Sequence, residues 1–176
     1  SKSYSALPCG QMDLISCFVN GELEKLKVKS ALYWRVFPGI KILEINVENA
    51  QMYDVISKIS QKATVCAGSI ITTWQANAAF EAGAKMFSSP IFQMNMVKNS
   101  KNIRVPFIAG ATTANEAYEA WKARIPLIKI FPTTALGGVQ YIEDILRQMP
   151  FLNVMPMGNI KTDEVVQRLK FNVVIS

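Results

Sequence analysis

A lysine inside an apolar segment is the residue of this chain whose type and position most clearly suggest a chemical reaction. Lys129 lies in residues 126–132 (PLIKIFP), where strand alternation places Leu127, Lys129 and Phe131 on one face. A buried ammonium costs free energy unless it is solvated, paired or deprotonated, and burial favours the neutral amine that attacks carbonyl carbons. Two interpretations stay open at this point: a nucleophilic lysine, or a lysine at a strand end whose head reaches water.

A carboxylate in a second apolar segment could work with this lysine. In residues 40–48 (IKILEINVE), alternation places Glu44, Asn46 and Glu48 on one face of the strand. The apolar residues 43, 45 and 47 lie on the other face, where we expect the helices to pack. An inward carboxylate is also costly, and pairing with Lys129 would offset that cost. Such a pair either only supports the fold or supplies an amine nucleophile and a proton shuttle, the minimum set for Schiff-base chemistry.

Short apolar segments alternate with helical patterns along the chain. This order predicts parallel strands joined by right-handed crossovers, and eight strands at a spacing of roughly twenty residues predict a closed (β/α)8 (TIM) barrel of the α/β class. We expect one domain over residues 1–176, with residues 1–11 as an N-terminal extension and the last helix missing at a truncated C-terminus. The expected strands are 14–19, 40–47, 63–67, 85–89, 104–109, 127–131, 153–156 and 172–175, and the expected helices are 22–36, 50–61, 73–82, 93–99, 114–124, 139–148 and 162–169.

Composition narrows the chemistry. The chain has no histidine, which removes serine–histidine and cysteine–histidine catalysis and the usual zinc sites. Cys9, Cys17 and Cys66 are widely spaced and odd in number, which favours reduced thiols in an intracellular compartment such as the cytosol or an organelle matrix. No apolar run reaches the length of about 18 residues that a membrane-spanning helix needs. The net charge is +6, but the basic residues are scattered along the chain, which favours a solvated surface over a nucleic-acid site.

Several segments carry a resemblance to a known family. They are residues 39–44 (GIKILE), 67–69 (AGS), 81–90 (EAGAKMFSSP), 106–110 (PFIAG), 129–132 (KIFP), 135–142 (ALGGVQYI) and 155–158 (MPMG). In order and spacing the chain resembles the 2-dehydro-3-deoxy-phosphogluconate (KDPG) / 4-hydroxy-2-oxoglutarate (KHG) aldolase family, class I aldolases on a small (β/α)8 barrel. Segment 135–142 is similar to plant and plastid members, which makes the plastid stroma one candidate compartment.

The resemblance implies roles for individual residues. Lys129 takes the place of the Schiff-base lysine, and Glu44 takes that of the general acid and base, acting partly through water. Ser69 replaces a threonine that binds the carboxylate of a 2-oxo acid. The other residues expected at the substrate are Asn46, Glu48, Thr112, Phe131, Met157, Gly158 and Asn159, with Gly158 in the phosphate cradle. The implied reaction needs no metal ion and no organic cofactor.

Several positions depart from the family pattern around the expected anion-binding groups. Glu48 stands where members often carry an arginine that holds an anionic substrate group, and a like charge there weakens binding if it is desolvated. Thr133 and Thr134 replace the usual Ala-Glu pair. Met157 stands at a common threonine, and Asn159 replaces the second glycine of a Gly-Gly pair. The chemical pair is therefore kept while the anion-binding groups differ.

Three hypotheses follow for the function. The first is a Schiff-base aldolase that cleaves or forms 2-oxo acids such as KDPG or KHG, giving pyruvate and an aldehyde. The second is a catalytically degenerate barrel that serves as a structural or binding subunit of a larger assembly. The third, RNA binding, rests on basic charge alone. The expected partners are a small 2-oxo acid and either further copies of the chain, a trimer by resemblance, or the other subunits of a larger complex. No nucleic acid and no membrane span are expected.

Overall fold

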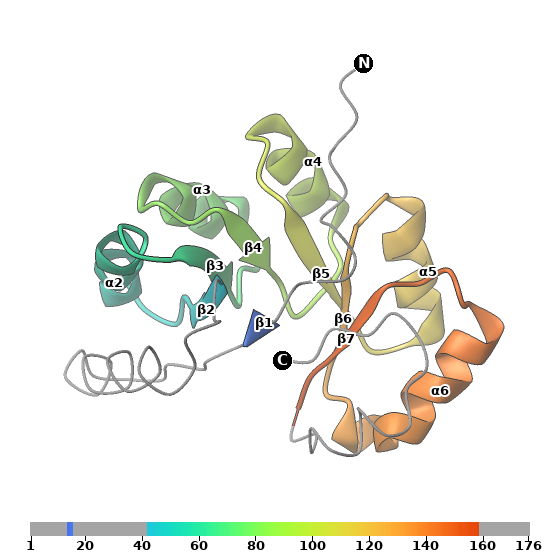
Figure 1. Cartoon of the computed structure of the whole chain (residues 1–176). Helices are drawn as coiled ribbons and strands as arrows, with labels where there is room; N and C mark the ends of the chain where they lie inside the picture. The colour runs from blue at the N-terminus through green and yellow to red at the C-terminus, as the bar shows by residue number, and fades with distance from the viewer. Residues whose placement is uncertain (1–13, 16–41, 159–176) are drawn as a thin grey trace.

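The computed structural model describes residues 14–15 and 42–158 of the chain (Figure 1). Several expectations lie outside these residues. They are the N-terminal extension, the helices expected at 22–36 and 162–169, the strand expected at 172–175, and Asn159.

The described strands form one parallel sheet in which each strand pairs with the next along the chain. The strands are β1 (Leu14–Ile15), β2 (Ile42–Asn46), β3 (Thr64–Gly68), β4 (Met86–Ser88), β5 (Phe107–Ala111), β6 (Ile128–Ile130) and β7 (Val154–Pro156). Sequential parallel order is the order of a βα barrel. The sheet contains seven of the eight expected strands, so an α/β fold with a parallel sheet is confirmed and closure of the barrel stays a prediction.

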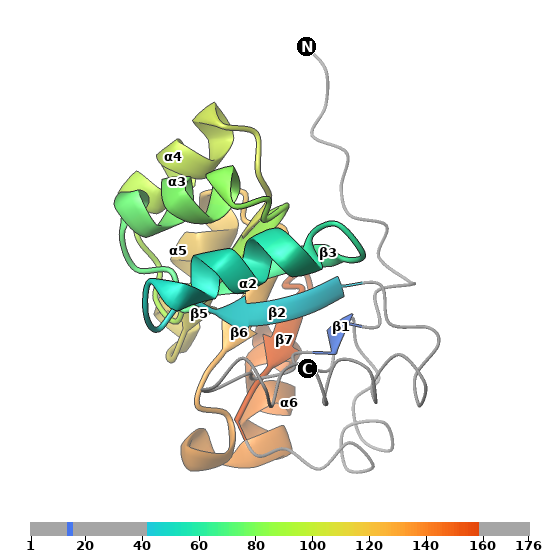
Figure 2. The same ribbon diagram turned by 90° about the vertical axis from the view of Figure 1, so that its left-hand side faces the viewer.

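Helices connect the strands and cover one side of the sheet. They are α2 (Gln51–Ile59), α3 (Thr73–Glu81), α4 (Met94–Asn102), α5 (Ala114–Lys122) and α6 (Gly138–Gln148), with a short 3₁₀ turn η1 (Thr134–Leu136) before α6. Figures 1 and 2 show these helices around the outer side of the curved sheet. Within the described residues, no helix is long and apolar enough to span a membrane.

Two of the helices begin at capping boxes, which explains why they start where they do. At α5, the hydroxyl of Thr113 accepts from the Glu116 N–H, and Glu116 Oε2 accepts from the Thr113 N–H at 2.8 Å. Thr112 N–H also donates to Glu116 Oε2 at 2.8 Å. Hydrogen bonds from the backbone of Thr112, then of Thr113, lower the pKa of Glu116. Thr72 and Gln75 form the same arrangement at α3.

The two faces of the sheet pack in separate apolar clusters. On the outer face, strand residues such as Ile45, Phe87 and Ile128 pack with residues of the helices. On the inner face, a smaller cluster contains Cys66, Met86, Ile108, Leu127 and Met155, with Ile42 packed against it. The alternation predicted for the segments around Glu44 and Lys129 is therefore confirmed.

Strand β5 begins and ends later than the sequence predicts. Arg104 has a φ of 59°, which a strand does not accommodate, and the N–H of Val105 donates to the Ser100 carbonyl, closing α4. At the other end, Ala111 pairs with Ile130 of β6 and extends the strand beyond residue 109. Helix α4 likewise runs to Asn102, beyond the expected end at residue 99.

Candidate active site

Strands β2 and β6 bring Lys129 and Glu44 together on the inner face. Nζ of Lys129 donates to Oε1 of Glu44 at 2.7 Å, and the two side chains are 4% and 2% exposed. Removal of both charges from water is costly, and the short charge-assisted hydrogen bond offsets much of that cost. The contact joins a potential nucleophile to a group that can take its proton.

Gly68 of β3 gives the Glu44 carboxylate its space. A Cβ at position 68 would lie 2.5 Å from Oε1 of Glu44 and 2.3 Å from Oδ1 of Asn46. No side chain fits at such distances, so glycine lets the carboxylate lie against β3. Among the sequence patterns, Gly68 appears only within segment 67–69 of the family resemblance, and these patterns predict no role for it. The sequence feature that could have predicted this role is a glycine inside a strand segment, because such a glycine often marks a close approach of other groups.

An apolar layer lies directly beneath the ion pair. Cys66, a free and completely buried thiol, pairs in register with Glu44 and belongs to the inner cluster with Ile108 and Met155. Burial raises the pKa of the Cys66 thiol well above its usual value; the Glu44 charge raises it further and the Lys129 charge opposes that effect. The thiol is therefore neutral at physiological pH, as its apolar surroundings require.

Most of the other expected site residues follow the carboxyl ends of strands. Because the carboxyl ends of parallel strands meet at one edge of the sheet, these residues follow the edge at which βα folds bind ligands. The residues are Asn46 at the end of β2 and Glu48 just after it, Ser69 after β3, Thr112 after β5, Phe131 after β6, and Met157 with Gly158 after β7.

Ser69 is notable for its backbone conformation, and Glu48 for its exposure to solvent. Ser69 has a φ of 58°, a left-handed conformation that costs free energy for a residue other than glycine and often occurs at functional sites. Glu48 is exposed, so water screens its charge. The repulsion expected between Glu48 and an anionic ligand is weaker in this setting than for a desolvated carboxylate.

Thr112 and Phe131 lie where two neighbouring strands end. The Thr112 hydroxyl donates to the Phe131 carbonyl at 3.0 Å, and the Tyr141 hydroxyl donates to the Thr112 carbonyl at 2.6 Å. The hydroxyl proton of Thr112 is therefore already used to join the ends of β5 and β6, and only its oxygen is left to accept from a ligand. The Phe131 side chain is 38% exposed.

The threonine pair that departs from the family pattern fastens the loop after β6 to the end of β7. The completely buried Thr133 hydroxyl donates to the Ile130 carbonyl at 2.6 Å and accepts from the Met157 N–H at 3.0 Å. The Thr134 hydroxyl donates to the Gly158 carbonyl. Both threonines thus position the segment expected to hold an anion, a role that no pattern in the sequence indicates.

Residues 42–158 contain no group of three or more histidine, cysteine, aspartate or glutamate side chains that could hold a metal ion. Among the described residues, the functional groups of the site are an amine, a carboxylate and hydroxyls.

Comparison with known proteins identifies the family. A family model described as KDPG and KHG aldolase matches residues 19–176. The chain belongs to this aldolase family. The resemblance read from the sequence segments is therefore confirmed, and it extends over nearly the whole chain.

Individual relatives of this aldolase-family chain are distant. The 2-dehydro-3-deoxy-phosphogluconate aldolase of Treponema pallidum is 28% identical over 132 residues, which cover 73% of this chain and 63% of the relative. The KHG/KDPG aldolase of Escherichia coli K12 is 27% identical over 125 residues, which cover 69% of this chain and 59% of the relative. The match therefore spans about three fifths of these relatives.

The fold of the family is shared as well. A KDPG aldolase from Legionella pneumophila, solved with pyruvate captured as a covalent carbinolamine intermediate, has a TM-score of 0.78 at 22% identity, covering 91% of this chain and 79% of that chain. At this identity the likeness shows the fold, and the chemistry of this chain has to be argued from its own residues.

Proposed function

We propose that this chain is a class I aldolase, a carbon–carbon lyase that cleaves or forms 2-oxo acids such as KDPG or KHG, giving pyruvate and an aldehyde. The 2.7 Å contact between Lys129 Nζ and Glu44 Oε1 on the inner face of the sheet is the observation that carries the proposal. The relatives named above are aldolases, which supports the same reaction class.

The ion pair supplies the groups for each proton transfer. Glu44 takes a proton from the Lys129 ammonium, and the free amine adds to C2 of the 2-oxo acid to give a carbinolamine. Glu44 returns its proton to the C2 hydroxyl, which leaves as water, and an iminium remains. The iminium withdraws electrons from the C3–C4 bond while Glu44 takes the C4 hydroxyl proton, so the aldehyde leaves. Glu44 then protonates C3, and water releases pyruvate.

Pyruvate is the best supported ligand. The Legionella relative of this fold holds pyruvate as a carbinolamine, the intermediate that the Lys129 amine would form. We assign the pyruvate carboxylate to Ser69, which follows β3 with a left-handed backbone of the kind that often occurs at functional sites. Of the two substrates named, the exposed carboxylate of Glu48, where family members often carry an arginine, favours the one without a phosphate, KHG, over KDPG.

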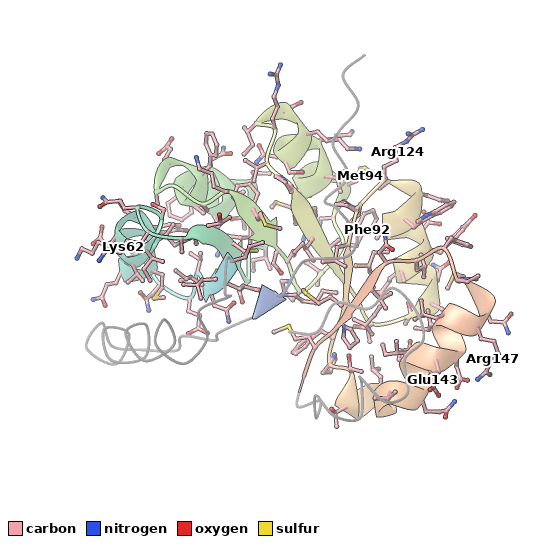
Figure 3. All side chains as sticks on the ribbon, in the orientation of Figure 1. Lys62, Phe92, Met94, Arg124, Glu143 and Arg147 are labelled. Carbon is pink, nitrogen blue, oxygen red and sulfur yellow. The ribbon has the colours of Figure 1, made fainter. Side chains whose placement is uncertain are left out.

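Borohydride trapping with pyruvate tests this function. Reduction fixes an iminium as a stable amine, and intact mass with peptide mapping locates it. We expect an adduct on Lys129, its loss in Lys129→Ala, and its retention in Lys62→Ala, which changes an exposed lysine beside α2 (Figure 3). Absence of an adduct in the unchanged chain, or an equal adduct in Lys129→Ala, would refute the proposal.

Interpretation of Lys129→Ala requires a check of folding. This change leaves the Glu44 carboxylate buried without its partner, which costs roughly 3–5 kcal/mol. Peptide mapping of the unchanged chain avoids this difficulty, because the modified lysine is identified directly. An unlabelled Lys129 in a folded chain would leave the degenerate-scaffold hypothesis.

Association of several copies of the chain is part of the proposal. Tyr118 and Trp121 of α5 and Phe151 before β7 are 38%, 41% and 45% exposed, and the Trp121 and Phe151 rings are 4.5 Å apart between centroids. Exposed aromatic groups are typical of interfaces. Light scattering on a sizing column should give a multiple of the chain mass that falls in Trp121→Lys, and a monomer in both would contradict this.

A further inference from the structure

Two buried polar atoms have no hydrogen-bond partner among the described residues: Oε2 of Glu44 and Oγ of Ser88. Ser88 is the last residue of β4 and is completely buried. An unpaired buried hydroxyl costs free energy, and an unpaired carboxylate oxygen costs more. Native proteins contain few such atoms, so each one calls for a physical explanation.

Ser88 points to the inner face of the sheet. Side chains alternate along β4, and the two residues before Ser88 define the faces. Met86 belongs to the inner cluster, whereas Phe87 belongs to the outer cluster beneath the helices. The Ser88 hydroxyl is therefore on the same face as the Lys129–Glu44 pair.

The pairing of β2, β3 and β4 gives the offset, in residues along the strands, between Ser88 and Glu44. Glu44 of β2 pairs with Cys66 of β3, and Cys66 pairs with Met86 of β4. Ser88 is therefore two residues further along β4 than the position in register with Glu44.

The register from the other side completes the placement. Ser88 pairs with Ile108 of β5, while Gly110 of β5 pairs with Lys129 of β6. Ser88 is therefore two residues short of the position in register with Lys129. Tilted strands of a βα barrel are staggered by about one residue per strand, and inward side chains from alternate strands form one layer. Glu44, Ser88 and Lys129, on β2, β4 and β6, thus form one layer.

The two unpaired atoms are chemically complementary to one kind of ligand group. The Ser88 hydroxyl can donate a hydrogen bond, and the Glu44 carboxylate oxygen can accept one. A ligand hydroxyl accepts from the first and donates to the second, which satisfies both atoms at once. A carbinolamine on Lys129 has such a hydroxyl on C2, the carbon bonded to Nζ. This hydroxyl donates to Glu44 when Glu44 is a carboxylate, and it accepts from Glu44 when the carboxyl carries the proton taken from Lys129.

We propose that Ser88 and Glu44 together hold the C2 oxygen of the 2-oxo acid. This assignment rests on the proposed Schiff-base function and adds a residue to its site. When the amine of Lys129 adds to C2, the second bond between C2 and its oxygen breaks, and its electron pair moves onto that oxygen, to which the Ser88 O–H donates. The oxygen then takes a proton from the nitrogen now bonded to C2 and becomes the carbinolamine hydroxyl. A donor placed where charge develops lowers the barrier.

Dehydration then proceeds without a change in Ser88. The C2–O bond breaks as the Glu44 carboxyl proton moves to the hydroxyl, and the nitrogen lone pair forms the C=N bond of the iminium. Water leaves, Glu44 is a carboxylate again, and Ser88 keeps its proton throughout. The reverse sequence hydrolyses the product iminium. Ser88 therefore acts only on the steps that change the bonding of the C2 oxygen, which are addition of the amine, loss of water, and the reverse of both when the product iminium is hydrolysed.

Replacement of Ser88 separates this role from packing. Ser88→Ala removes the hydroxyl, and loss of one such donor should slow borohydride-trapped iminium formation with pyruvate on the order of 10²-fold. The midpoint of urea unfolding should stay or rise, because the unpaired hydroxyl is gone. The matched control is Ser100→Ala, which removes a buried hydroxyl that donates to Val97 within α4 at 3.0 Å. We expect an unchanged trapping rate there, with a lower unfolding midpoint.

Ser88→Cys keeps most of the side-chain volume with a much weaker donor, and it should be as slow as Ser88→Ala. Trapping of Ser88→Ala at the unchanged rate overturns the assignment of Ser88 and leaves the aldolase proposal standing. A loss of folded Ser88→Ala together with an unchanged rate in Ser88→Cys assigns Ser88 to packing. Absence of any adduct on Lys129 in the unchanged chain overturns both proposals.

Discussion

Replacement of Gly68 by alanine perturbs Glu44 without changing any of its atoms. The new Cβ would lie 2.5 Å from Oε1 and 2.9 Å from Cγ of Glu44, and 2.3 Å from Oδ1 of Asn46. Real Cβ contacts essentially never fall below 3.0 Å, so the carboxylate has to move by at least about 0.5 Å. The backbone at Gly68 is not left-handed, so the substitution acts through these contacts rather than through backbone strain.

The size of the effect follows from the contact that Glu44 makes. Its Oε1 accepts from Lys129 at 2.7 Å, and the shift lengthens or breaks this hydrogen bond. A misplacement of about 1 Å in a reacting site can cost about 10²-fold in rate, so we expect a loss of about 10- to 100-fold in iminium formation with pyruvate. Overpacking should lower the free energy of unfolding by about 1–3 kcal/mol.

The assay is the rate of borohydride-trapped adduct formation, with urea unfolding of the same samples. Ala67→Gly is the matched control, since Ala67 is the preceding residue and packs on the outer face. That change should lower the free energy of unfolding by roughly 0.5–1 kcal/mol and leave the trapping rate unchanged. The contrast separates displacement of Glu44 from weakening of β3.

A double-mutant cycle with Glu44→Gln decides whether Gly68 acts through Glu44. If it does, Gly68→Ala adds little to the loss already caused by Glu44→Gln, because residues in contact are not additive. If the two rate factors multiply, or if Gly68→Ala traps pyruvate at the unchanged rate, the inferred role of Gly68 is wrong.

Two further predictions concern the elements around the site. Thr133→Val removes the buried hydroxyl that binds the Ile130 carbonyl and the Met157 N–H, so the free energy of unfolding in urea should fall by about 1–3 kcal/mol; Thr133→Ser should lose less, and equal losses would contradict the hydrogen-bond explanation. The lowered pKa of Glu116 means that its charged form stabilises the fold at neutral pH, and this stabilisation is lost as pH falls through that lowered pKa. Glu116→Gln should therefore show a smaller drop in urea midpoint between about pH 7 and about pH 3 than the unchanged chain, and equal drops would count against this.

The sequence predicts the contact between Lys129 and Glu44 because strand alternation fixes side-chain direction. Both residues lie in segments so apolar that their period of two is unambiguous, and the inner and outer clusters follow that period. The positions of most helices and strands follow from the same patterns. Strand β5 is the exception, since its start depends on the left-handed backbone at Arg104, which no side-chain pattern indicates.

The roles of Ser88 and Thr133 could not be predicted, for two different physical reasons. The place of Ser88 depends on the stagger between β2, β4 and β6, which is a property of the assembled sheet and not of any one segment. The role of Thr133 depends on a hydrogen bond to a residue 24 positions away, across two strand ends. Both require the register of strands, whereas a sequence pattern gives only the face on which a side chain lies.

The inner face itself bears on the choice between an aldolase and a scaffold. Beneath the polar layer, the inward residues are apolar or a neutral thiol, as in Met86, Leu127 and Met155. A barrel kept only as a scaffold gains nothing from a buried ion pair, because apolar residues of similar volume are often equally or more stabilising. It gains still less from the oxygens of Glu44 and Ser88 that have no hydrogen-bond partner within residues 42–158, because each costs free energy while it stays unpaired. The polar layer is therefore better explained by a reacting ligand than by the stability of the fold.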